Sequence, residues 1–509
     1  MTVSQNTDHK THPRPKPKIS RPRGLPGWAL GVIYLVLTVG PVIAAIWLGG
    51  GARHGQNLAP LIGRALGILA MAMLLLQFLT SGRFEQISGR IGLDRTMGFH
   101  RVAAGALLLV IVGHIAGFMF RAQSWAPDVL LARLAAMITS TGLLGGTLAA
   151  GILLLLVLWA KYLRHQMARY EIWRLLHGGL AVAAMVLALR HSFVHARLFA
   201  DPLGTGTIIV LAVIALGSIG IIYVWRLYQG RAQGFVVDAV HTRAPGIAEL
   251  ILRGPKDGAF RFTAGQFAWL TLGRRHSVTD NPFSILSLPS ELPRLRFMIR
   301  DAGDMTHTVP ALVPGTPVAI DGPHGSFTLQ KVDISKPVLL IAGGIGIVPV
   351  LGVLAQLAEY RITSPVYLLL AVRDGAELRL LRDQLPGLQK NLDLRALCLF
   401  EHGEGEVPTN IENITVQKAR YDQTHLVRLL DGQDTAEMVA FVCGPPVMMD
   451  AAIDDLAVMG VLDANIRMER FDYDAANDII SRRQRQHFTL ILMAGVVITV
   501  LATILSVWM

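Results

Sequence analysis

Two stretches of equal length decide the fold of this chain. Residues 100–114 read HRVAAGALLLVIVGH and residues 177–191 read HGGLAVAAMVLALRH, so each begins and ends on a histidine and is otherwise largely apolar. An interval of this length is close to four turns of α-helix, so both histidines of a stretch fall on one helix face, about 21 Å apart. That rise is about two-thirds of the ~30 Å hydrocarbon core of a bilayer. Each stretch therefore predicts a membrane-spanning helix with one imidazole near each membrane face.

Apolar runs of spanning length recur along the whole chain. We expect membrane helices near 27–48, 61–80, 98–120, 142–160, 173–194 and 206–227, and a seventh at 488–508. Lys and Arg gather on one side of these helices, beginning with a basic, Pro-rich tail at 1–26 that is predicted to be disordered. Because the basic side is the cytoplasmic one, the tail and the long stretch before the seventh helix are predicted to lie inside.

The composition excludes several classes of protein. Of the 509 residues, 16% are charged and 52% are hydrophobic, which excludes a wholly soluble, a disordered and a collagen-like chain. The net charge of +11 lies largely beside apolar runs, which indicates membrane topology and not nucleic-acid binding. The two cysteines, Cys398 and Cys443, are too few for a Cys₄ zinc site, an iron–sulfur cluster or a disulfide framework.

The four histidines form two level pairs. They lie on the third and fifth helices, which run in the same direction, so His100 is level with His177 and His114 with His191. Two stacked pairs of imidazoles in a bundle interior are the ligands that two six-coordinate b-type haems need. The alternative is that each histidine is only a polar residue with a partner in the bundle; the repeated interval favours ligands. His195 is a rival for His191, but its longer interval from His177 breaks the level match.

From about residue 232 the pattern becomes that of a soluble protein with two domains. Short β-branched and aromatic runs predict an antiparallel barrel or sandwich, with strands at 234–241, 247–253, 266–272, 294–300 and 316–321. Apolar runs alternating with helical stretches then predict a parallel doubly wound sheet, with strands at 337–342, 366–372, 394–399 and 438–442. The predicted domains are a tail (1–26), a membrane haem domain (27–230), a β-barrel (231–333), a nucleotide domain (334–475) and a last helix (488–508).

Two segments of the predicted barrel offer groups that suit a flavin and its phosphates. They are Pro282, Phe283 and Ser284 in the first, and Arg300, Gly303 and Thr306 in the second. An aromatic ring beside hydroxyl groups provides a stacking face and hydrogen bonds for an isoalloxazine. An arginine beside a glycine turn can hold a pyrophosphate through its charge and through backbone N–H groups. The structural alternatives are an ordinary strand end and a surface cation.

Two turns of the predicted parallel sheet suit a nicotinamide dinucleotide. They are Gly343, Gly344 and Gly346 after one strand, and Cys443, Gly444 and Pro445 after another. Glycines let a diphosphate approach the backbone at a helix N-terminus, and ligands bind at the carboxyl edge of such sheets. A structural turn and a buried apolar cysteine are the alternatives. Arg373, which follows a third strand, favours NADPH over NADH because a guanidinium pairs well with a 2′-phosphate.

In this order the segments resemble the ferric reductase/NADPH oxidase superfamily over about residues 27–475. The membrane half is similar to its six-helix, two-haem domain, and the soluble half to ferredoxin–NADP reductase-type dehydrogenases. The resemblance implies FAD at Pro282–Ser284, its phosphates at the Arg300 segment, and NAD(P)H at the glycine loop with Cys443 near the nicotinamide. It also implies that Phe471 caps the flavin and that a buried Arg64 lies beside the outer haem. Asn281 and the seventh helix depart from the family pattern, and the helix suggests a second tether or a protein partner.

The resemblance further implies an enzyme that transfers electrons across a bacterial inner or plasma membrane. Cytosolic NAD(P)H would reduce FAD, and electrons would pass through two b haems to an outer acceptor. Dioxygen, giving superoxide, is favoured because the outer loops are short and the outer histidine has cationic neighbours such as Arg190. The alternatives are a ferric-chelate reductase, a haem subunit that hands electrons to a partner protein, and a membrane sensor that binds nucleotide without turnover.

Overall fold

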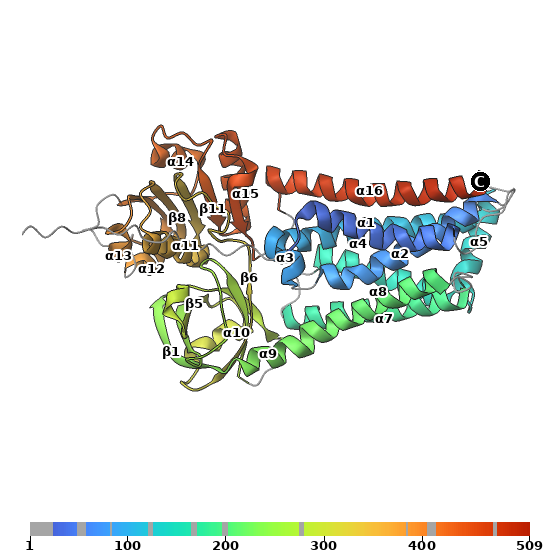
Figure 1. The fold of residues 1–509 in the computed structure, drawn as a ribbon, viewed down its shortest axis with the longest axis horizontal. Helices are drawn as coiled ribbons and strands as arrows, with labels where there is room; N and C mark the ends of the chain where they lie inside the picture. The colour runs from blue at the N-terminus through green and yellow to red at the C-terminus, as the bar shows by residue number, and fades with distance from the viewer. Residues whose placement is uncertain are drawn as a thin grey trace, which may run out of the picture.

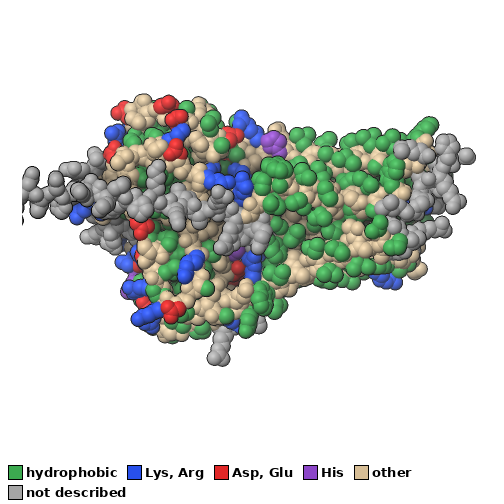
Figure 2. Space-filling view, viewed as in Figure 1, with side chains coloured by type: hydrophobic (Ala, Val, Ile, Leu, Met, Phe, Trp, Pro, Cys, Tyr) green, Lys and Arg blue, Asp and Glu red, His purple; other side chains and the backbone are tan. Residues whose placement is uncertain are grey.

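The computed structural model describes residues 24–47, 57–81, 84–120, 126–163, 170–195, 202–273, 279–382, 385–404, 414–471 and 476–508. The predicted basic tail lies outside these residues up to position 23. Figure 1 shows an elongated molecule, with long helices side by side at one end and two sheets at the other. The charged side chains on the visible face gather over the sheets, whereas hydrophobic side chains cover the helices (Figure 2).

In the described residues, seven helices are long and apolar enough to cross a membrane. They are α1 (Gly27–Trp47), α2 (Leu58–Thr80), α4 (Leu93–Met119), α6 with its π-helical end (Leu144–Leu163), α7 (Tyr170–His195), α8 continuing into α9 (Pro202–Ala232) and α16 (Ile479–Trp508). Each apolar run identified in the sequence corresponds to one of these helices. A lipid environment offers no partner for backbone N–H and C=O groups, so runs of this kind fold as helices, which satisfy both groups internally.

Helix α2 forms the centre of the bundle. It packs along α4 and also contacts α1, α8 and α16, and most of its side chains between 63 and 78 are buried. The last helix, α16, is part of the same bundle, because it packs on α1, α2 and α4. Two shorter helices complete this half: α3 (Glu85–Ile91) precedes α4, and α5 (Pro127–Thr139) lies between α4 and α6. The sequence did not predict α5, which forms part of an outer connection expected to be a loop.

The first sheet has six antiparallel strands in the order β4-β3-β6-β1-β2-β5. The strands are β1 (Phe235–Ala244), β2 (Ile247–Arg253), β3 (Phe267–Leu272), β4 (Asn281–Ser284), β5 (Arg294–Arg300) and β6 (Pro317–His324). The two edge strands approach one another through an isolated bridge between Ile285 and Phe297. A single bridge is not a ladder of paired residues, so the sheet is open, and the prediction of a closed barrel is wrong on this point. Strand β4 is short and contains Pro282, which has no N–H to donate to a ladder.

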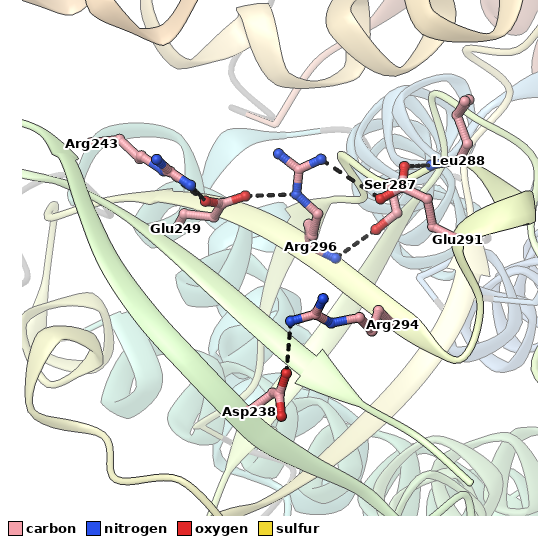
Figure 3. Close-up of polar contacts among 8 residues, drawn as sticks. All are labelled: Asp238, Arg243, Glu249, Ser287, Leu288, Glu291, Arg294 and Arg296. Carbon is pink, nitrogen blue, oxygen red and sulfur yellow. Dashed lines mark hydrogen bonds and ion pairs between the residues drawn. The ribbon is translucent and has the colours of Figure 1, made fainter. Parts of the chain in front are cut away.

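A buried carboxylate ties three strands of this sheet together (Figure 3). Glu249 of β2 is fully buried; its side chain accepts hydrogen bonds from Nε of Arg243 on β1 and from Nε of Arg296 on β5, each at 2.7 Å. Burial alone would raise the pKa of Glu249, but the two guanidinium groups outweigh it and hold the pKa below its usual value. The carboxylate is therefore charged at neutral pH and links β1, β2 and β5.

The second sheet has six parallel strands in the order β10-β9-β8-β7-β11-β12. They are β7 (Val338–Gly343), β8 (Val366–Asp374), β9 (Leu394–His402), β10 (Ile414–Lys418), β11 (Val439–Cys443) and β12 (Ile466–Glu469). The helices are α11 (Ile347–Tyr360), α12 (Arg379–Arg382), α13 (Leu385–Gln389), α14 (Gln423–Leu430) and α15 (Pro446–Val458). Alternate residues of β7 enter two separate cores, Leu340 in one and Leu339 in the other. Burial on both faces is typical of the doubly wound sheet that the sequence predicted; β10 and β12 were not predicted.

We expect Glu249→Gln to destabilise the first sheet by about 2 kcal/mol at neutral pH, because it removes the charge that two guanidinium groups bind. Since the folded-state pKa is lowered, this stabilisation is complete above the unfolded value of about 4.3 and is lost as the pH falls through the lower folded value. Thermal unfolding of both proteins between neutral and acidic pH measures the difference. Glu437→Gln, at an exposed ion pair with Lys336, is the control. A gap between Glu249→Gln and the parent protein that does not shrink in acid would contradict the assignment.

Candidate functional site

The outer pair of histidines faces across the bundle at the end remote from the sheets. The ring centroids of His114 on α4 and His191 on α7 lie 6.5 Å apart, with the ring planes at 88°. Nδ1 of His114 is 2.7 Å from the carbonyl oxygen of Gly63 on α2. A carbonyl can only accept, so the proton lies on Nδ1 and Nε2 is left to bind a metal. The arrangement has the features of a histidine ligand oriented by a backbone acceptor.

Two glycines leave the space that these rings occupy. A Cβ built on Gly67 of α2 would lie 2.7 Å from Nδ1 of His114, and one built on Gly146 of α6 would lie 2.8 Å from Nδ1 of His191. Atoms in packed interiors do not approach so closely, so a larger residue at either position must displace the ring. Each outer histidine therefore rests on a glycine of the neighbouring helix.

The inner pair lies at the end of the bundle nearer the sheets. Oγ1 of Thr80 is 3.4 Å from Nδ1 of His100, and His177 stacks on Trp173 with centroids 5.1 Å apart. The rings of His100 and His177 are close enough to interact electrostatically. The structure thus brings together the two pairs that the sequence spacing predicted. Their role as haem ligands stays a prediction.

The geometry of the outer pair fits a haem iron. A metal bound by two imidazoles lies about 2 Å from a nitrogen of each ring. The 6.5 Å between the ring centroids of His114 and His191 leaves room for one such ion. The inner rings have polar and aromatic neighbours, Thr80 and Trp173, that can orient them in the same way.

The glycine loop and the cysteine turn lie side by side where the strand order of the parallel sheet reverses. They follow β7 and β11, which are neighbours in the sheet, and the loop forms a short 3₁₀ turn, Gly344–Gly346, before α11. A Cβ on Gly346 would collide with the carbonyl of Cys443, and one on Gly343 with the ring of Pro445. These glycines therefore allow the two turns to touch. Such a reversal point is where nucleotides bind in open α/β sheets.

The thiol of Cys443 is buried at this reversal point. Burial and the negative charge of Glu469, its register partner on β12, raise the pKa of Cys443. The group is therefore a neutral thiol at physiological pH, suited to packing against a ligand ring and not to nucleophilic attack.

Glu469 is a site residue that sequence reasoning missed. Its side chain is buried, and burial together with the charge of Asp94 on α4 raises its pKa well above the usual value. Oε2 of Glu469 has no hydrogen-bond partner in the described part of the chain. A buried polar atom of this kind beside Cys443 fits a cofactor or nucleotide site. A single glutamate at the end of a short strand gives no signal in the sequence.

Phe471, the predicted flavin cap, lies at the boundary between sheet and bundle. Its ring meets that of Phe267 edge-on at 5.5 Å, and it packs in a small cluster with Leu93, Met97 and Trp269. Phe267 is the register partner of Ser284. Phe471 therefore lies near the strand of the proposed flavin segment. The two segments are far apart in the sequence, so their spacing could not have shown this.

The flavin segment forms β4, where Phe283 is half-buried against the core of the first sheet and Ser284 is buried. In the second segment, Oγ1 of Thr306 accepts hydrogen bonds from the backbone N–H groups of Ala302 and Gly303, at 2.8 and 2.9 Å. These bonds shape the turn into the short helix α10 (Asp304–His307). The hydroxyl therefore builds the turn whose N–H groups were expected to meet phosphate.

Arg300 lies between the two sheets. Its guanidinium pairs with both carboxylate oxygens of Glu377, with Nη1 to Oε1 at 3.2 Å, and Nη2 lies 3.2 Å from the position that a Cβ on Gly344 would take. The sequence had associated Arg300 with flavin phosphates; in the structure it adjoins the glycine loop. Glu377 follows β8 of the second sheet, so it reaches Arg300 only when the two sheets fold together. The spacing of residues in the sequence does not show this contact.

Two further arginines differ in how they meet expectation. Arg64 is exposed on α2, so the expectation that it is buried is wrong. Consecutive residues of a helix point about 100° apart, so Arg64 does not share the direction of the buried Gly63 that precedes it. Arg373 is exposed at the carboxyl end of β8, the edge at which ligands bind. Its neighbour Asp374 accepts a hydrogen bond from the N–H of Ala376 at 2.9 Å and so caps the following turn.

Two protein families match this chain. Residues 66–188 match the ferric reductase like transmembrane component, and residues 340–454 match the oxidoreductase NAD-binding domain. The chain joins a ferric reductase-like membrane domain to an NAD-binding reductase domain. Both are domains of oxidoreductases, and the pair is the one expected for the ferric reductase/NADPH oxidase superfamily, so the resemblance found in the sequence is confirmed.

Individual relatives match part of the chain. The reductase component of propane 2-monooxygenase from Mycolicibacterium goodii is 30% identical over 247 residues, which is 47% of this chain and 65% of that protein. The electron transfer subunit of dihydroorotate dehydrogenase B (NAD(+)) from Streptococcus pneumoniae strain R6 is 32% identical over 150 residues, 29% of this chain and 58% of that protein. The chain thus spans less than two-thirds of either relative. A flavohemoglobin structure from Malassezia yamatoensis, with bound FAD and heme, aligns with a TM-score of 0.43 and 20% identity, over 74% of this chain and 99% of that one.

We expect Gly67→Ala and Gly146→Ala each to displace an outer histidine, because the added methyl group would overlap the ring of His114 or His191. If the two histidine pairs hold one haem each, as the spacing predicts, loss of the outer pair should remove about half of the haem and leave the spectrum of the other. Reduced-minus-oxidised difference spectra and haem content measure this.

The matched controls for this experiment are Gly105→Ala and Gly151→Ala, on α4 and α6. At both positions nothing lies within 4 Å of the added Cβ, so spectrum and haem content should be normal. Normal spectra in both Gly67→Ala and Gly146→Ala would show that His114 and His191 are not the ligands.

Proposed function

We propose that this protein transfers electrons across a membrane, from cytosolic NAD(P)H to an acceptor on the outer side. The observation that carries the proposal is the facing pair His114 and His191. The second pair expected from the spacing, His100 and His177, lies within electrostatic range at the end of the bundle nearer the reductase domain. When bound, FAD and two b haems would supply the conversion of a two-electron hydride donor into single-electron transfers. The basic residues on the sheet side of the bundle support a cytoplasmic reductase domain in a bacterial inner or plasma membrane.

The residues at the reversal point of the parallel sheet would bind the nucleotide. The backbone of Gly343–Gly346 would meet the diphosphate at the start of α11. Arg300, which adjoins Gly344, could exchange Glu377 for a phosphate oxygen. Cys443, as a neutral thiol, would contact the nicotinamide, and Arg373 at the edge of the sheet would meet a 2′-phosphate in NADPH. Gly444 and Pro445 would hold the cysteine turn against the glycine loop.

An ion pair connects the proposed flavin strand to the helix of the inner histidine. Nη1 of Arg174 on α7 lies 2.7 Å from Oδ1 of Asp280, and the two side chains are only 11% and 6% exposed. Arg174 is three residues before His177, and Asp280 directly precedes β4. A second pair, Arg226 with Asp321 at 3.1 Å, joins α9 to β6. These contacts would hold the flavin segment beneath the inner histidines, which keeps the distance between electron donor and acceptor short.

The outer end of the bundle favours dioxygen as the acceptor. Arg190 directly precedes His191, and its Nη1 lies 3.6 Å from the position of a Cβ on Gly145. Positive charge here would stabilise a developing superoxide anion. The same cation would attract an anionic ferric chelate, so ferric-chelate reduction is the second candidate; a protein acceptor docking beside α16 is a third.

We expect Asp280→Asn to slow electron arrival at the haems while leaving flavin reduction by NADPH unchanged, because Arg174 loses its buried partner and the flavin strand is no longer held to α7. A buried pair with one partner removed costs on the order of 3 kcal/mol. Stopped-flow absorbance at the flavin and haem bands separates the two steps.

Asp238→Asn is the control for this experiment. Its carboxylate pairs with Arg294 on the same sheet, at 3.0 Å (Figure 3), so its substitution leaves the Arg174–Asp280 pair in place. If haem is reduced at the parent rate in both Asp280→Asn and Asp238→Asn, the Arg174–Asp280 ion pair is not needed for electron transfer from the flavin to the haems.

The acceptor can be identified by reducing the protein anaerobically with NADPH and then adding oxygen or a ferric chelate while haem reoxidation is followed. We expect fast reoxidation by oxygen, with superoxide detected as cytochrome c reduction that superoxide dismutase suppresses. Fast reoxidation by the chelate with no superoxide would replace the oxidase by a ferric reductase. Slow reoxidation by both would favour a protein acceptor.

A further inference from the structure

A pocket of about 210 Å³ opens where the helical bundle meets the sheets. It is lined by residues of α3, of the first turn of α4, of the segment after β6 and of β12. None of the lining residues belongs to the segments proposed to bind flavin or nucleotide. The pocket is therefore a separate feature of the boundary between bundle and sheets.

Positive charge dominates the lining of this pocket. It contains the cations Arg90, Arg95, Lys331 and Arg467 and one carboxylate, Asp94. Within the described part of the chain, none of the four cations forms an ion pair. Four cations against one carboxylate leave this concave surface with an excess of positive charge, which favours the binding of an anion.

Arg95 and Arg467 are the central pair. Both are half-buried, and burial together with the charge of Arg95 lowers the pKa of Arg467. Nη1 of Arg467 donates to the carbonyl of Ala464 at 2.7 Å, which leaves its other N–H groups for a ligand. Two guanidinium groups held close in this way are the arrangement that binds phosphate oxygens in pairs.

Neutral polar groups complete the lining. Ser326, Thr328 and Gln330 come from the segment that follows β6, and hydroxyl and amide groups donate hydrogen bonds to anions without adding charge. The pocket lies at the start of α4, whose apolar span begins at Leu93. This is the level at which the phosphates of the inner leaflet lie beside a spanning helix.

We propose that this pocket binds a phosphate group, carried by an anionic lipid of the inner leaflet or by a free phosphate. The bound anion would bridge Arg95 on α4 and Arg467 on β12, and so join the membrane bundle to the parallel sheet. This inference goes beyond the proposed electron transfer and does not depend on the identity of the acceptor.

The test uses the purified full chain with its cofactors and two probes. Native mass spectrometry in detergent compares binding of phosphatidylglycerol and phosphatidylcholine, and thermal unfolding is followed during titration with inorganic phosphate at constant ionic strength. The test variant is Arg95→Gln with Arg467→Gln. The control is Arg253→Gln with Arg420→Gln, which removes the same charge from side chains that are 64% and 80% exposed.

We expect the parent and the control to bind one of the probes saturably, and the test variant to bind it about tenfold or more weakly, because paired charge-assisted hydrogen bonds are lost. Preference for phosphatidylglycerol over phosphatidylcholine identifies a lipid headgroup, and saturable stabilisation by phosphate without that preference identifies a free phosphate. Binding of neither probe, or equal binding by the test variant, would overturn the proposal.

A second variant guards against loss of folding. Arg90→Gln with Lys331→Gln removes two exposed cations of the same pocket and should weaken anion binding with unchanged FAD and haem content. If FAD content falls together with anion binding in either variant, the pocket belongs to the cofactor site and the proposal of a separate anion site fails.

Discussion

The facing of His114 and His191 is the constraint on which the rest of the bundle depends. The rings are 6.5 Å apart because α4 and α7 run in the same direction and present the same face at the same height. Nothing larger than glycine fits at Gly67 or Gly146 beside them. The helices α2 and α6, which carry these glycines, must therefore pack closely on α4 and α7.

A second constraint joins the bundle to the sheets. Charged side chains at such a boundary lose water, so each needs a partner. Arg174 meets Asp280 and Arg226 meets Asp321, and Phe471 adds an apolar contact with Leu93 and Met97. Both ion pairs connect the inner ends of the helices to the first sheet, one at Asp280 just before β4 and the other at Asp321 in β6. The proposed flavin strand is thus fixed relative to α7, which a flexible linker would not achieve.

Sequence patterns predicted elements well where one local property decides the structure. The spanning helices follow from the length of the apolar runs. In hydrocarbon the backbone N–H and C=O groups of such a run must bond within the run itself, and a helix achieves this. The parallel strands around Leu340 follow from apolar runs buried on both faces. Strands β10 and β12 were not predicted because they are short and lie at the two edges of the sheet. Helix α5 was not predicted because, at 13 residues, it is too short to cross a membrane.

The spacing of the four histidines, the order of the domains and the glycine and cysteine turns could be read from the sequence alone, because each is a property of neighbouring residues. Three features are visible only in the folded chain: Arg300 meets Glu377, Glu469 lies buried beside Cys443, and Arg64 is exposed. Those facts arise where elements distant along the chain pack together. Burial and the nearest opposite charge set the state of such groups, and neither is encoded in local spacing.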